Sequence, residues 1–309
     1  MDAMEISFGT IMLLQISIGV LMNAFLLLFH THMVSASHRL SYSDLILAHL
    51  ALANSLTLLS RGIPDTLYIW GLINFLDDMG CKILIYLYRV SRGLSICTTC
   101  LLSIFQAVTI SPSTFRWAGF KAKLPQCVIL SCLLSWVMNL LIDFYILKYV
   151  TGPRNSSSVQ IVMDLKYCIK VSAEPETKLA IAVVLPLRDL FFVGLMSVAS
   201  GYMVFVLHRH HRQVRHLHGP GSSLRVMPEV QAAKRVIALV TLYVLLYGRQ
   251  AVMLSVIINM KEKSPLLVRV HLLLSFSFSV VSPFLMIHSD RRLSVFWKRD
   301  FPVSNTDPS

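Results

Sequence analysis

The sequence predicts an all-α membrane protein, a bundle of seven transmembrane helices. Hydrophobic residues make up 55% of its 309 residues and charged residues only 14%, whereas a soluble domain carries about 25% charge. The mean hydropathy is +0.65. The apolar residues are gathered into seven stretches, and each is close to or longer than the roughly 20 residues that cross a bilayer as a helix. The stretches are Phe8–Phe29, Ser43–Gly62, Cys81–Ile110, Pro125–Leu147, Leu179–Leu207, Ala233–Ile258 and Leu267–Ser289.

The distribution of charge predicts the orientation of the bundle. The segment before the first stretch carries only acidic charge, and that stretch is too long for a signal-peptide core, so we expect an uncleaved first span with the N-terminus outside. Lys and Arg favour the segments that this orientation places inside. The excess of positive charge near the inner surface should attract anionic lipid. The net charge of +12 lies in the breaks between spans, so we exclude nucleic-acid binding. We expect an extracellular N-terminus (1–7), a seven-helix receptor domain (8–289) and a cytoplasmic amphipathic helix and tail (290–309).

The breaks between the spans are short, and none can bury a core of its own. The longest are 148–178 outside and 208–232 inside, and the inner break 111–124 is basic. The His-rich run 208–218 favours a solvated basic loop over a metal site, because Arg residues intervene and no acidic or Cys ligand joins it. After span seven, Leu293, Phe296 and Trp297 predict a short amphipathic helix on the inner surface; the alternative is a disordered basic tail.

Two of the six cysteines fall on the predicted outer side. Cys81 opens span three and Cys168 lies in the large outer break, whereas the other four lie within spans three and four. An oxidising exterior favours a disulfide between these two cysteines over two free thiols. The same break carries the N-glycosylation acceptor Asn155-Ser156-Ser157.

Charged residues inside spans are costly and point to function. Arg89 and Arg92 lie three residues apart on one face of span three, two to three turns below Cys81. Either they contact a ligand, which would then be anionic or strongly hydrogen-bond accepting, or they form internal ion pairs, with Asp143 and Asp189 as partners, or snorkel to the interface. Internal pairing is favoured because an unpaired charge is so expensive there.

Other polar residues in the spans have less specific roles. Arg188 and Asp189 are neighbours in span five and point about 100° apart, so we expect each to reach another helix rather than its neighbour. Arg249 in span six has no partner that the sequence identifies. Three in-span amides are expected to join helices by hydrogen bonds; they are Asn23, Asn54 and Asn139.

No pattern in the sequence indicates catalysis. A spaced Ser/His/Asp set, a metal-ligand pattern and a phosphate-binding loop are all missing from it, so we expect neither an enzyme nor a cofactor or metal site. A transporter or channel is the alternative from another class, but the inverted repeats of many transporters are not evident.

Five segments resemble one family, the vomeronasal type 1 receptors, a branch of the seven-helix G-protein-coupled receptors. The stretch that ends span three is long and specific, and the similarity runs through nearly the whole chain. The segments are Tyr88–Pro112, Leu190–Val204, Gln213–His218, Pro228–Glu229 and Ser282–Phe284.

The resemblance implies detection of pheromones or odorants at the plasma membrane and signalling through an inhibitory-type heterotrimeric G protein. It also implies the Cys81–Cys168 disulfide and a glycan at Asn155. Gln106 stands where rhodopsin-like receptors at large carry the arginine of Asp-Arg-Tyr, and Ser282-Pro283 stands where they carry Asn-Pro; the family shares both departures. Span six lacks the proline of the wider superfamily and carries Gly248-Arg249 instead.

These expectations give a working hypothesis. A small molecule enters beneath the Cys168 loop and contacts spans three, five and six, and the inner ends of spans five and six then move outward. A bitter-taste-type receptor and a receptor-like protein that no longer signals are the nearer alternatives. The expected ligand contacts are Arg89, Arg92, Tyr243 and Tyr247, and the expected G-protein contacts are Gln106, Arg116, Lys121, Lys123, Arg215 and Arg235.

Overall fold

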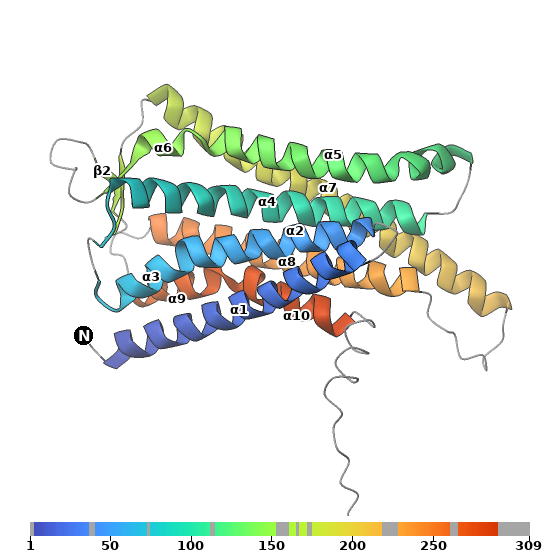
Figure 1. Cartoon of the computed structure of the whole chain (residues 1–309), viewed down its shortest axis with the longest axis horizontal. Coiled ribbons are helices and arrows are strands. Elements are labelled where there is room, and N and C mark those ends of the chain that lie inside the picture. Colours follow the sequence, from blue (N-terminus) through green and yellow to red (C-terminus); the bar gives the residue numbers. More distant parts are fainter. Residues whose placement is uncertain are drawn as a thin grey trace, which may run out of the picture.

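The computed structural model describes residues 3–36, 41–72, 75–111, 115–152, 161–164, 167–171, 175–217, 228–259 and 265–289. Long helices run side by side along the molecule (Figure 1). The elements are α1 (Ala3–Ala36), α2 (Tyr42–Thr57), η1 (Leu58–Gly62), α3 (Ile63–Ile69), α4 (Asp78–Ile110), α5 (Phe115–Asp143), α6 (Ile146–Tyr149), β1 (Val150–Thr151), β2 (Ile161–Asp164), β3 (Ile169–Val171), α7 (Pro175–Leu217), α8 (Pro228–Asn259), α9 (Pro265–Ser275) and α10 (Ser277–Ser289).

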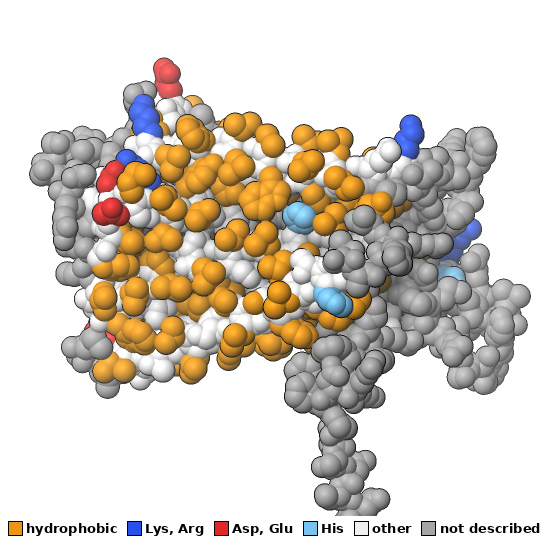
Figure 2. Space-filling model, in the orientation of Figure 1, with side chains coloured by type: hydrophobic (Ala, Val, Ile, Leu, Met, Phe, Trp, Pro, Cys, Tyr) orange, Lys and Arg blue, Asp and Glu red, His pale blue; other side chains and the backbone are white. Residues whose placement is uncertain are grey.

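Seven helical segments of the described chain are long and apolar enough to cross a membrane, which confirms the predicted fold class. Their outer faces carry exposed apolar side chains, with Leu21, Leu141 and Val198 among the most exposed. Figure 2 shows these side chains along the length of the bundle and charged side chains near its two ends. Lipid rather than water suits such a surface.

Helix α4 occupies the centre of the bundle, where it contacts α2, α5, α7 and α8. Buried amides join the helices to one another as predicted. Asn54 Nδ2 donates to Ser282 Oγ at 3.0 Å, and Ser95 Oγ donates to Asn54 Oδ1 at 3.1 Å, so one side chain links α2, α4 and α10. Asn23 Nδ2 donates to the Ser279 carbonyl at 2.8 Å and links α1 to α10.

Three of the described spans depart from regular helix. The second contains the π-helical turn η1 between α2 and α3, the fourth is interrupted at Phe144–Tyr145 between α5 and α6, and the seventh is interrupted at Phe276 between α9 and α10. Such irregularities free backbone groups and recur at functional sites. None was apparent from the apolar pattern.

A small antiparallel sheet lies at one end of the bundle, which we call the disulfide end because Cys81 and Cys168 are bonded there. Its strand order is β1-β3-β2, with Val150 opposite Lys170 and Ile161 opposite Val171. The apolar pattern predicted only a break between spans here, because strands this short carry no usable periodicity.

The predicted inner breaks are shorter than expected. Helix α5 begins at Phe115, inside the expected basic break 111–124, and α7 continues to Leu217 through most of the His-rich run. Bilayer thickness limits the apolar stretch but not the helix, so polar residues can continue a helix beyond its apolar stretch. The expected surface helix (290–299) and Asn155 lie outside the described residues.

Candidate ligand-binding site

A cavity of about 60 Å³ lies between the second, third, sixth and seventh spans. That volume holds a few water molecules or one small polar group. Aromatic and polar side chains dominate its wall. The lining residues are Thr57, Tyr88, Arg92, Ser95, Tyr243, Leu246, Tyr247, Arg249, Gln250, Leu274, Ser275, Phe278 and Ser279.

Three of the four expected ligand contacts line this cavity. Arg92 comes from α4, and Tyr243 and Tyr247 come from α8, one helical turn apart with their rings stacked at 6.1 Å between centroids. The Arg92 guanidinium lies over the Tyr247 ring, 6.0 Å from its centroid. Arg89, the fourth, is absent from the described lining and faces α5 instead, where its Nε donates to Asp143 Oδ1 at 2.8 Å.

The expected internal ion pairs of Arg89 and Arg92 are confirmed. Asp143 is fully buried and also accepts from Arg188 Nη1 at 3.1 Å, so one carboxylate serves two guanidinium groups. Arg92 Nη2 lies 3.6 Å from Asp189 Oδ2, which is the longest of these contacts. The network thus joins α4, α5 and α7.

The expectation that Arg188 and Asp189 do not pair directly was wrong. Arg188 Nη2 lies 2.9 Å from Asp189 Oδ1, and Arg188 also donates to Asn139 Oδ1 at 3.1 Å. The long arginine side chain curls back over the helix surface, so the angle between neighbouring Cβ atoms does not prevent contact. Gly93 makes room for this cluster, because a Cβ at that position would lie 1.9 Å from Asn139 Oδ1.

Sequence reasoning missed Tyr88, Arg249 and Gln250 as cavity residues. Tyr88 precedes Arg92 by one turn of α4, a spacing that the sequence analysis could have used. Arg249 was noted as an in-span charge without a partner, which was itself a signal. In the structure its Nη2 donates to the Leu274 carbonyl at 2.6 Å, beside the interruption of span seven.

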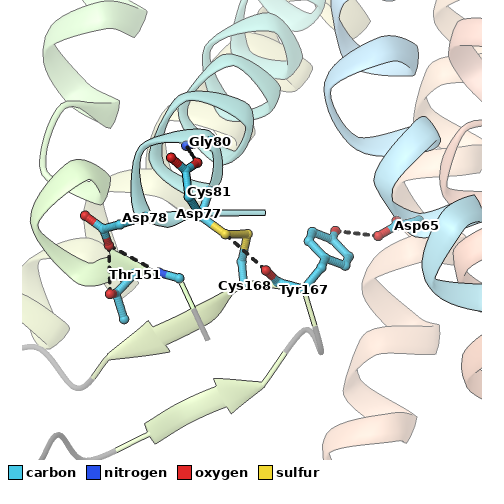
Figure 3. Close-up of a disulfide and its surroundings, with 9 residues drawn as sticks. Asp65, Asp77, Asp78, Gly80, Cys81, Thr151, Tyr167 and Cys168 are labelled. Carbon is cyan, nitrogen blue, oxygen red and sulfur yellow. Dashed lines mark hydrogen bonds between the residues drawn. A yellow bond between two sulfur atoms is a disulfide. The ribbon is translucent and has the colours of Figure 1, made fainter. Parts of the chain in front are cut away.

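The loop that precedes β3 is anchored at two consecutive residues at the disulfide end (Figure 3). Cys168 is bonded to Cys81 of α4, and the hydroxyl of the buried Tyr167 donates to Asp65 Oδ1 of α3 at 2.6 Å. Burial, together with the Asp65 carboxylate, raises the pKa of Tyr167, so the phenol stays protonated and keeps donating. The loop is therefore fixed to both the second and the third spans.

The second anchor is connected to the cavity wall. Arg61 Nε donates to Asp65 Oδ2 at 3.1 Å, and the Arg61 guanidinium lies 4.7 Å from the centroid of the Tyr88 ring, which lines the cavity. A cation over an aromatic face is attractive. The chain of contacts from Tyr167 to Tyr88 thus couples the loop to the site.

The expected G-protein contacts lie towards the opposite end of the bundle. Gln106 is buried in α4, Arg235 is partly buried in α8, and Lys123 is exposed on α5. Three more are in helices and not in loops, and their side chains lie outside the described part of the structure; they are Arg116 and Lys121 on α5 and Arg215 on α7.

Comparison with known proteins agrees with this architecture. The family model described as "Vomeronasal organ pheromone receptor family" matches residues 6–299. Vomeronasal type-1 receptor 3 of Homo sapiens is 38% identical over 295 residues, which cover 95% of this chain and 94% of that protein. Olfactory receptor class A-like protein 1 of Danio rerio is 37% identical over 287 residues, which cover 92% of this chain and 90% of that protein.

Solved structures extend the comparison to the fold. Squid rhodopsin superposes with a TM-score of 0.73 over 98% of this chain and 86% of that chain, at 15% identity, and this likeness concerns the seven-helix fold alone. With the matches through nearly the whole sequence, the chain belongs to the vomeronasal organ pheromone receptor family, within the seven-helix G-protein-coupled receptors.

Proposed function

We propose that this protein is a chemosensory receptor of the plasma membrane that detects pheromone-like small molecules and activates an inhibitory-type G protein. The observation that carries the proposal is the cavity beneath the anchored loop, where Arg92 meets Tyr243 and Tyr247. In this proposal the N-terminus and the disulfide end face the exterior, where oxidised cysteines persist. Membership of the receptor family supports both the detection of small molecules and the activation of a G protein.

The ligand contacts Arg92, Tyr243 and Tyr247, while Arg89 stays on Asp143 and holds the network in place. Because the cavity holds only a few waters, a ligand must widen it, and the wall that moves is α8 against α9 and α10. Ligand binding can shift the receptor towards an active state only through its higher affinity for that state.

At the opposite end, Ser111 Oγ lies 2.9 Å from the Tyr202 hydroxyl and connects α4 to α7. Outward movement of α7 and α8 would separate this pair and open a surface for the G protein. Basic residues on the helical extensions would then flank the docking site. The proposed contacts remain Gln106, Arg116, Lys121, Lys123, Arg215 and Arg235.

The test is G-protein activation in cells that express the full chain, measured as inhibition of cyclic AMP production across volatile, steroid and sulfated-steroid panels. We expect Arg92→Gln to raise the half-maximal ligand concentration about ten- to a hundredfold, the range for a lost hydrogen bond to a charged group. Arg269→Gln is the matched control, because Arg269 pairs with Glu5 at the surface. Equal potency in both variants contradicts the proposed binding mode.

Surface delivery is scored in the same cells. Asn155→Gln should remove a glycosidase-sensitive mobility shift if the loop faces the exterior. A glycan absent from protein that has reached the cell surface would contradict the proposed orientation.

A further inference from the structure

Arg249 is a cation inside a span, and it has no carboxylate partner within the described part of the chain. It lies in the sixth span, Val230–Gln250, where its Nη2 donates to the Leu274 carbonyl. Its Nε is buried and has no hydrogen-bond partner within the described structure. Arg249 as a whole is partly buried, and a guanidinium inside a span without a counter-charge is costly; the cost is relieved when an anion is brought to it.

The charges around the cavity do not balance either. Within the described structure, the three guanidinium groups of Arg89, Arg92 and Arg188 share two carboxylates, those of Asp143 and Asp189. Arg92 has the longest contact of the three and is the most exposed, at 37%. The two least neutralised cations of the described bundle interior are therefore Arg92 and Arg249.

These two cations line the same cavity from different helices. Arg92 projects from α4 and Arg249 from α8, and the side-chain amide of Gln250 adds a neutral hydrogen-bond donor to the lining. Among the described residues that line the cavity, none carries a carboxylate. An arginine fork matches the planar or tetrahedral oxygens of a carboxylate, sulfate or phosphate.

From this geometry we infer that Arg249 is the anchor of an anion site, with Arg92 as the second contact. The site takes a compact anionic group joined to an apolar body, and that body packs against Tyr247 and Phe278. The inference rests on the proposed function only for the role of the ligand; anion binding itself needs no G protein. Loading the site also neutralises the charge beside the Leu274 carbonyl, where span six meets the interruption of span seven.

Thermal unfolding of the purified full chain in phosphatidylcholine nanodiscs tests the inference. The probes are phenyl sulfate and its neutral analogue methyl phenyl sulfone. We expect a saturable rise in Tm with phenyl sulfate and none with the sulfone. Arg249→Gln should raise the half-saturating concentration at least about tenfold, whereas the surface control Arg269→Gln should leave it unchanged. A wild-type protein without a saturable response, or an Arg249→Gln variant that responds like wild type, overturns the inference.

Arg249→Lys keeps the measurement decisive if Arg249→Gln does not fold. Lysine retains the charge but loses the fork, so we expect weaker binding that still prefers the sulfate over the sulfone. Unchanged affinity would count against Arg249 as the anchor. Nanodiscs that contain phosphatidylglycerol separate the two sources of the anion: a Tm rise without probe that Arg249→Gln abolishes assigns the site to a lipid headgroup.

The two proposals can fail separately. A protein that binds phenyl sulfate through Arg249 but never inhibits cyclic AMP production would contradict the proposed receptor function alone. A protein that signals in response to neutral ligands but shows no saturable sulfate response would contradict the anion site alone.

Discussion

Replacing Asp143 with Asn should be among the most destabilising single changes in this bundle. The carboxylate is fully buried and accepts from Arg89 Nε at 2.8 Å and from Arg188 Nη1 at 3.1 Å. Asparagine keeps the size but removes the negative charge, and its NH2 group faces a guanidinium donor. The guanidinium groups of Arg89 and Arg188, both largely buried, then lose the negative charge that they share.

Breaking a buried ion pair from one side costs about 3–5 kcal/mol, because the partner charge stays in a medium of low dielectric. By the scaling for domains of roughly 150–250 residues, that loss lowers Tm by about 10 °C. The matched control is Glu5→Gln, which removes the ion pair with Arg269. The Glu5 side chain is 31% exposed and the Arg269 side chain is 23% exposed. Exposed pairs contribute about 0–1 kcal/mol, so the control should barely change Tm.

The assay is thermal unfolding of purified receptor in nanodiscs, followed by intrinsic fluorescence. A double-mutant cycle adds Arg89→Gln: the double variant should lose less stability than the sum of the two single losses, because Arg89 no longer carries an unpaired charge. Two results would contradict this description of how α4, α5 and α7 are held together. One is an Asp143→Asn variant with the same Tm as Glu5→Gln. The other is a pair of stability losses, from Asp143→Asn and from Arg89→Gln, that simply add in the double variant.

Two further changes test the loop anchor and the packing around the network. Tyr167→Phe removes the hydrogen bond to Asp65 and should lower the free energy of unfolding by about 1.5–3 kcal/mol, measured by urea or thermal unfolding. Because the folded-state pKa of Tyr167 is raised, the stability that this bond contributes should be constant below about pH 10 and decline only above it. A stability difference that varies between neutral pH and pH 9 would contradict the assignment. Gly93→Ala places a Cβ 1.9 Å from Asn139 Oδ1 and should lower the free energy of unfolding by about 1–3 kcal/mol through overpacking. Gly201→Ala is the control, because a Cβ there has nothing within 4 Å and should cost no stability. Equal Tm values for the two variants would refute the steric argument.

The spans were predictable because each is decided locally. A backbone in lipid must satisfy its own hydrogen bonds, so length and apolarity alone identify a transmembrane helix. The cysteine pair was predictable for a similar reason, since only Cys81 and Cys168 fell on the predicted oxidising side. The partners of Arg89 and Arg92 could be named because in-span carboxylates are so few.

The rest depended on how the helices are rotated and where they cross. Arg188 and Asp189 pair because the side chain curls along α7, and Arg89 faces α5 while Arg92 faces the cavity, although both lie on one helix. Arg249 lines the cavity and donates to the Leu274 carbonyl, two residues before the interruption of span seven at Phe276. The sequence alone determined how many helices cross the membrane, but only long-range packing decided which charges pair closely and which two arginines line the site.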